Sequence, residues 1–120
     1  MIAGIFVAAV ALLHMVFMYM ECVLWCRPAG RRIFAMSEQQ ARETAVLAAN
    51  LGLYNGFLAA GLVWGLLDDA CGRQITVFFL GCIVIAGVFG SITARRSILW
   101  LQALPGAIAL LLVVLEPGWQ

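Results

Sequence analysis

Charge is scarce in this chain of 120 residues, and lysine is absent from it. Charged residues make up 11% of the sequence, and its seven basic residues are all arginines, against six acidic residues. No basic tract is present that could neutralise a run of phosphates, which excludes nucleic acid binding. Apolar residues reach 65% and the mean hydropathy is +1.05, whereas soluble domains are roughly 45–50% apolar. The composition therefore predicts a membrane protein.

The residue patterns of common enzyme sites are also missing. The sequence has one histidine and four cysteines, with no CxxC pair and no zinc-ligand spacing. It has no HExxH motif, no phosphate loop and no Ser/His/Asp arrangement. We therefore expect no metal site, and the sequence supports neither a nucleophilic enzyme nor a particular cofactor.

Four apolar runs are separated by short polar connections. Each run is about the length that a transmembrane helix needs. The second helix is predicted to start near residue 38, because Ser37 and Gln40 have the form of a capping box. Pro105 falls inside the fourth run, and we expect it to kink that helix or loosen one turn. The predicted spans cover about 2–26, 44–67, 74–93 and 98–115.

Such short connections place neighbouring helices antiparallel. The predicted fold is thus an all-α integral membrane protein, an up-down-up-down bundle of four transmembrane helices that forms one domain over residues 1–120. Six of the seven arginines flank the first and third connections, and only Arg73 flanks the second. By the positive-inside rule, the first and third connections are expected in the cytoplasm and both termini outside.

Small residues recur at four-residue spacing in the second run. Gly52, Gly56 and Ala60 form one row, and Gly61 and Gly65 form another. In lipid, helices associate where small residues allow close backbone approach. The rows predict tight packing between the second and third helices, with room for a ligand as the alternative.

Glu21 is the most informative polar residue within a predicted span. An acid there costs several kcal/mol unless it is paired, protonated or next to water. At ~1.5 Å per residue, Glu21 lies about 8–9 Å from Arg27, towards the cytoplasm. Asn50, Ser91 and Gln102 lie at a similar depth in their own spans. We therefore expect a polar layer in the cytoplasmic half of the bundle.

Residue spacing indicates which of the polar side chains share a helix face. Glu43, Asn50 and Tyr54 form one stripe on the second helix, and His14 lies two turns from Glu21 on the first. Asn50 or Tyr54 is the expected partner of Glu21, with Gln102 as a third choice. For the amides, hydrogen bonding that only holds the helices together is the competing interpretation. The candidates for ligand binding or proton carrying are Glu21, Asn50, Tyr54, Asn55, Gln102, His14, Tyr19, Glu43 and Ser91.

The segment LAANLGLYNGFLAAGLVWG at 47–65, with Glu21 before it and Pro105 after it, resembles a known family. This is the small bacterial membrane family catalogued as domain of unknown function 1304, and the resemblance covers nearly the whole chain. The resemblance implies a four-span protein of the bacterial inner membrane and no particular reaction. The architecture is also similar to that of the membrane-associated eicosanoid and glutathione proteins, although Val46 stands where that family has an arginine.

The leading functional hypothesis is a binding protein for a small amphiphile or lipid-like molecule. The polar end of this ligand would contact Glu21 and the amides around it, and its tail would lie along the glycine and alanine rows. The alternatives are a small proton-coupled transporter that uses Glu21, a membrane enzyme that acts on a lipid-phase substrate, and a purely structural scaffold. Membrane lipid and a second copy of the chain are the expected partners, because so small a chain needs a second copy to enclose a cavity.

Overall fold

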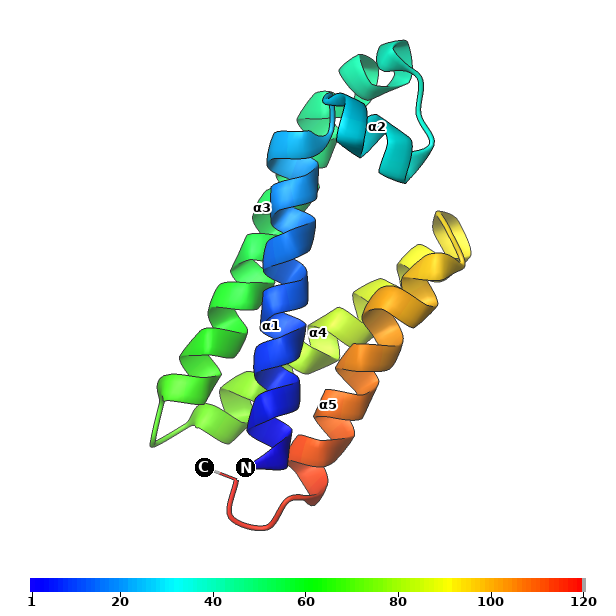
Figure 1. Cartoon of the computed structure of the whole chain (residues 1–120). Coiled ribbons are helices and arrows are strands. Elements are labelled where there is room, and N and C mark those ends of the chain that lie inside the picture. Colours follow the sequence, from blue (N-terminus) through cyan, green and yellow to red (C-terminus); the bar gives the residue numbers. More distant parts are fainter. Residues whose placement is uncertain (120) are drawn as a thin grey trace. The chain divides into compact units, whose positions relative to one another are not determined.

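The structure is a computed structural model in which residues 1–119 are described, and every regular element in that stretch is helical (Figure 1). Two of the segments, η1 and η2, are π-helical and continue directly into or out of α-helices. The elements are α1 (Ile2–Tyr19), η1 (Met20–Leu24), α2 (Pro28–Phe34), α3 (Glu38–Leu67), α4 (Gly72–Thr93), η2 (Leu99–Ala103) and α5 (Leu104–Leu115).

Three helical segments are long and apolar enough to cross a membrane: Ile2–Leu24, Glu38–Leu67 and Gly72–Thr93. A fourth apolar segment, Leu99–Leu115, is shorter. The all-helical class predicted from the sequence is confirmed, and the three long apolar helices are those expected of a membrane protein. The four-span bundle stays a prediction.

Local sequence signals determine where α3 starts and why a π turn precedes α5. The backbone N–H of Gln40 donates to Ser37 Oγ at 3.1 Å, and the N–H of Ser37 donates to Gln40 Oε1 at 3.0 Å, which confirms the capping box. Pro105 has no N–H to give to the preceding turn, and η2 lies directly before it. The N–H of Leu104 bonds to the carbonyl of Leu99, five residues back, so the expected loosening takes the form of a π turn.

The short helix α2 was not predicted, since residues 27–32 look like a polar connection. Pro28 occupies its first turn, where the missing N–H costs nothing and the fixed φ suits a helix. At its other end, Ala35 adopts a left-handed conformation with φ 51°, and the N–H of Met36 donates to the carbonyl of Arg31 at 2.9 Å. Gly30 lies against the end of η1, where a Cβ would overlap the carbonyl of Leu24.

The chain forms two compact units: residues 12–59, and residues 1–11 together with residue 60 onwards. In the first unit, the end of α1 and η1 pack on the first part of α3 at Gly52 and Gly56 (Figure 1). A Cβ at Gly52 would lie 2.5 Å from Cys22 Sγ and 3.1 Å from Glu21 Cβ, and one at Gly56 would lie 2.7 Å from Met18 Sδ. This glycine row therefore packs against the first predicted helix rather than the third.

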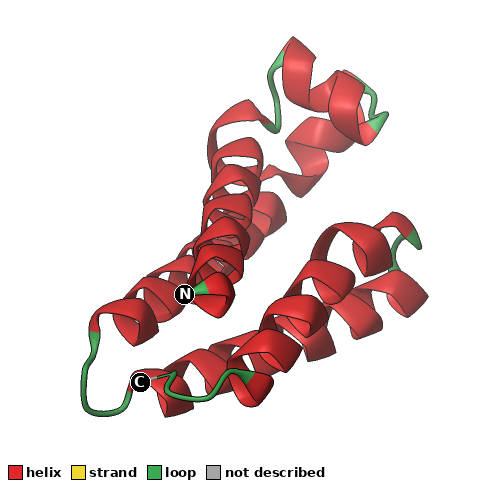
Figure 2. Cartoon of the chain, turned by 60° about the horizontal axis from the view of Figure 1, so that its bottom comes forward, coloured by secondary structure: helices red, strands yellow, loops and turns green. Residues whose placement is uncertain are grey.

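In the second unit, α4 runs beside η2 and α5 (Figure 2). A Cβ at Gly87 would lie 2.6 Å from the backbone nitrogen of Ala103, and one at Gly106 would lie 2.8 Å from Ile83 Cγ2. Gly65, in the second row on α3, faces Thr76 of α4. Only this second row thus follows the expected packing between the second and third predicted helices. Neighbouring atoms occupy the space beside the glycines of both rows.

Hydrogen bonds of the second unit tie the chain ends and the α3–α4 turn. The Glu116 carboxylate accepts hydrogen bonds from the Met1 ammonium group and, at 2.8 Å, from the Ala3 N–H. Asp68 Oδ1 accepts from the N–H of Cys71 at 2.7 Å, directly before α4. Arg73 Nη2 donates to the carbonyl of Val114 at 2.8 Å. The start of α1 is therefore fastened to the end of α5, and the start of α4 to the last turn of α5.

Replacing Gly52 with alanine should lower stability by about 1–3 kcal/mol, because the new Cβ overlaps Cys22 and Glu21. Gly81→Ala is the matched control, since a Cβ at Gly81 has no atom within 4 Å and alanine favours a helix by about 1 kcal/mol over glycine. Thermal unfolding of both variants in the same detergent measures the difference. Equal melting temperatures would contradict this packing.

Acid should loosen the tie between the chain ends. The hydrogen bonds from the Met1 ammonium group and the Ala3 N–H hold the pKa of Glu116 below its usual value. A lowered pKa in the folded state stabilises the fold above the unfolded pKa of about 4.3, and the gain is lost as the pH falls through the folded pKa.

Glu116→Gln should therefore flatten the fall in melting temperature between neutral pH and the acid side of pH 4. The variant Asp69→Asn, in the exposed α3–α4 turn, serves as the control and should keep the wild-type slope. An unchanged acid slope in Glu116→Gln would show that this carboxylate does not fasten the ends.

Candidate functional site

The candidate site lies where α1 widens into the π turn η1, in the unit formed by residues 12–59. Glu21 is the second residue of this turn. Isolated π turns are rare and occur frequently at functional sites, because they change the direction in which side chains point. The one acid predicted to lie within a span therefore coincides with an irregularity in its helix.

Three side chains of this region bond to α3 in antiparallel order. Cys26 Sγ donates to the Ala41 carbonyl at 3.5 Å, and Cys22 Sγ donates to the Ala49 carbonyl at 3.6 Å. Between them, Trp25 Nε1 donates to Thr44 Oγ1 at 3.0 Å. The Trp25 ring also packs on Phe34 of α2, with ring centroids 4.6 Å apart. These contacts fix η1 against α3 and so fix the position of Glu21.

Glu21 is held by Asn55. The Asn55 Nδ2 atom donates to Glu21 Oε2 at 2.7 Å, and both residues are half-buried. Within residues 1–119, the ion pairs of the structure join Glu116 to Met1 and Glu38 to two arginines, and none of them includes Glu21. The carboxylate thus has a neutral partner, which neither supplies a counter-charge nor fills all of its acceptor positions.

The prediction that Asn50 or Tyr54 is the partner of Glu21 was wrong. Asn50 is exposed, and its Nδ2 donates to the Val46 carbonyl of its own helix at 2.9 Å. Tyr54 is 55% exposed and lies beside Phe57. At 100° per residue, Asn50 lies about 160° around α3 from Gly52, which faces η1, whereas Asn55 lies about 60° away. The helix face that meets Glu21 was therefore predicted incorrectly.

The remaining candidates of this unit do not join the pair. Glu43 accepts a hydrogen bond from Gln39 Nε2 at 2.9 Å on the exposed start of α3. Tyr19 is 52% exposed. His14 is fully buried and meets the Phe17 ring edge-on at 5.6 Å between centroids. Of the candidates in this unit, Glu21 and Asn55 are the two that a hydrogen bond brings together.

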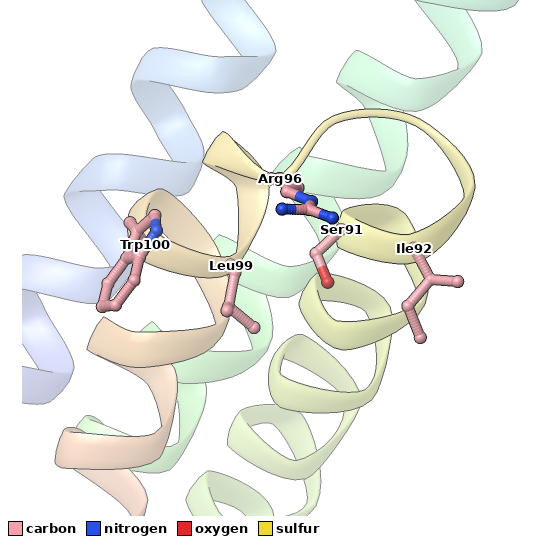
Figure 3. Close-up of a pocket in the computed structure, with 5 residues that line it drawn as sticks. All are labelled: Ser91, Ile92, Arg96, Leu99 and Trp100. Carbon is pink, nitrogen blue, oxygen red and sulfur yellow. The ribbon is translucent and has the colours of Figure 1, made fainter.

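Ser91 and Gln102 belong to the other unit. Gln102 is a half-buried residue of η2. Ser91 Oγ donates to the Val88 carbonyl at 2.7 Å and borders a pocket of about 590 Å³ at the end of α4 (Figure 3). The pocket is lined by Ser91, Ile92, Arg96, Leu99 and Trp100.

Sequence reasoning missed two of these pocket residues as functional groups. Arg96 entered the sequence analysis only as one of the arginines that orient the chain, and Trp100 did not enter it. The signal that could have found them is their spacing: they lie four residues apart across the short turn between two apolar runs. An arginine and a tryptophan at such a turn share the headgroup level of a membrane.

Glu21 and Asn55 together offer acceptors more than donors. The carboxylate has a second oxygen, and the Asn55 amide has Oδ1 in addition to the Nδ2 that it uses toward Glu21. Such a pair can accept hydrogen bonds from an ammonium or hydroxyl group, or the carboxylate can take up a proton. It offers no arrangement of nucleophile and base.

Comparison with known proteins assigns the chain to a family. Its profile, described as "Protein of unknown function (DUF1304)", matches residues 8–114. The chain is similar to the protein described as "Uncharacterized protein YpaA" from Lactococcus lactis subsp. lactis strain IL1403, with 27% identity over 107 residues that cover 88% of this chain and 87% of the relative. No solved structure matches. Because the family profile covers most of its length, the chain belongs to the family of proteins of unknown function DUF1304.

Proposed function

We propose that this protein crosses the inner membrane of a bacterium four times and binds a small amphiphile whose headgroup carries hydrogen-bond donors. The headgroup contacts Glu21 and Asn55. The first and third connections lie in the cytoplasm, and both chain ends lie outside.

The ties of the second unit support the fourth span. The start of α1 bonds to Glu116 after α5, and the start of α4 bonds to the last turn of α5 through Arg73. Both ties bring the end of α5 to the level at which α1 and α4 begin. Leu99–Leu115 rises about 25 Å, slightly less than the ~30 Å hydrocarbon layer, a mismatch that local thinning of a bilayer accommodates.

The observation that carries the binding proposal is the hydrogen bond from Asn55 to Glu21. An acid within a span costs several kcal/mol unless a donor, a proton or a counter-charge satisfies it. Asn55 supplies one hydrogen bond, and an ammonium headgroup would supply both the charge and further donors. A bond that served only to hold the helices together would need no charged partner, since a neutral amide does that equally well.

The ligand tail and a second copy of the chain complete the proposal. The tail lies in the surrounding lipid, because Met18 and Cys22 occupy the space beside Gly56 and Gly52. A second copy of the chain encloses the site, because a chain of 120 residues is too small to enclose a cavity alone. The protein is therefore a homo-oligomer within the membrane.

The proposed topology predicts opposite labelling of two exposed cysteines, Cys71 in the α3–α4 turn and Cys26 before α2. In single-cysteine variants of the full chain, a membrane-impermeant maleimide added to intact cells should label Cys71 and leave Cys26 unmodified. Opening the cells should expose Cys26, which provides the control. Labelling of Cys26 but not Cys71 in intact cells would show that the topology is the inverse of the one proposed.

Glu21→Gln should weaken binding of dodecylamine at least about tenfold, because the ammonium group of the ligand loses its counter-charge. The glutamine side-chain oxygen can still accept the hydrogen bond from Asn55. Glu43→Gln is the matched control, since it removes the same charge from the exposed start of α3 and should bind as the wild type does. Binding to the full chain in lipid nanodiscs is measured by equilibrium dialysis. Dodecanol provides the uncharged comparison.

Two results would overturn the proposal. Equal affinity of the wild type and Glu21→Gln for dodecylamine would leave the carboxylate as a structural group only. Proton uptake into vesicles that requires Glu21 in the absence of any amphiphile would favour the transporter. The melting temperature of Glu21→Gln should stay near that of the wild type.

A further inference from the structure

The pocket at the end of α4 combines a cation, an indole and an aliphatic wall. Arg96 comes from the turn between α4 and η2, and Trp100 comes from η2. In Figure 3 the guanidinium group of Arg96 and the hydroxyl of Ser91 lie in the same part of the pocket, with Trp100 and Ile92 at either side. The pocket thus presents a positive charge with apolar groups around it.

The place of the pocket in the chain sets the depth of its occupant. Both α4 and the segment Leu99–Leu115 are apolar, and the pocket lies where the first ends and the second begins. Trp100 is 65% exposed and Ile92 is 79% exposed, which in a membrane means contact with lipid. Indole rings concentrate at the level of the lipid headgroups. The pocket therefore opens at the boundary between headgroups and acyl chains.

We propose that this pocket binds the phosphate group of an anionic membrane phospholipid. Arg96 donates to the phosphate through its guanidinium fork, and Trp100, Leu99 and Ile92 contact the glycerol backbone and the first part of the acyl chains. A guanidinium group matches the geometry of phosphate oxygens, and a volume of about 590 Å³ is ample for a headgroup. Basic pockets between transmembrane helices bind such headgroups.

This site is separate from the pair formed by Glu21 and Asn55. Its residues belong to the other compact unit, and its charge is opposite. An acid and its amide select a donor-bearing headgroup, whereas an arginine selects an anion. Failure of either proposal therefore leaves the other standing.

Arg96→Gln is the test, with Arg95→Gln as the matched control. The two arginines are neighbours in the same turn and contribute the same charge, but only Arg96 lines the pocket. Delipidated full-length protein in a neutral detergent is titrated with dioctanoyl phosphatidylglycerol and dioctanoyl phosphatidylcholine, and bound lipid is counted by native mass spectrometry.

The wild type and Arg95→Gln should bind phosphatidylglycerol at least about tenfold more tightly than phosphatidylcholine, and Arg96→Gln should lose this preference. Arg96→Lys keeps the charge without the fork and should retain part of the preference, which keeps the test decisive if the glutamine variant unfolds. Glycerol phosphate should not displace the lipid.

Three results would overturn the proposal. An equal loss in Arg95→Gln and Arg96→Gln would show attraction to the whole turn rather than a site. Equal binding of the two lipids by the wild type would remove the anionic selectivity. Displacement of the lipid by an equal concentration of glycerol phosphate would assign the pocket to a soluble phosphate ester instead.

Discussion

In lipid, an apolar side chain gains nothing by leaving its surroundings, so helices associate only where their backbones come close enough for dense contact. The other features of this protein depend on that constraint. Gly87 lies against the backbone of Ala103, Gly106 lies against Ile83, and Gly52 lies against the end of α1. At each position a Cβ would be too close to its neighbour. The glycines are therefore contact points between helices.

Dense packing leaves few places for polar groups within the spans, and the structure puts two of them on irregular turns. Glu21 lies on η1 and Gln102 on η2. The cause of η2 is Pro105, which removes one backbone donor from the ladder. In η1 no proline is present, and the widened turn coincides with the residues that bond to α3.

The sequence was sufficient wherever a signal was local. The capping box at Ser37 and the disturbance at Pro105 depend on residues within one turn, and both are present in the structure. The partner of Glu21 depends on how α3 is rotated about its axis, and rise per residue does not determine rotation. Gly52 could have indicated this rotation, because a glycine at a close approach marks the face of α3 that contacts its neighbour. Asn55 lies three residues after Gly52, near the same face.

The features that sequence reasoning missed share a different cause. Arg31, Arg32 and Arg96 were interpreted only through the total charge of their connections, which orients a chain but does not distinguish one arginine from another. Yet the first two lie in the last turn of α2, and the third lines a pocket together with Trp100. In a chain with only seven basic residues, each arginine has individual surroundings that a charge count discards.

The two candidate sites place different demands on a ligand, which follows from their depth as much as from their charge. Glu21 is part of an apolar helix, where a bound cation must leave water, so that discrimination depends on how completely the headgroup replaces its lost hydrogen bonds. Arg96 lies in a turn between helices, where water and salt compete for the phosphate and the contact is correspondingly weaker. Added salt should therefore weaken the pocket at Arg96 more than the pair at Glu21, which gives each site its own physical signature.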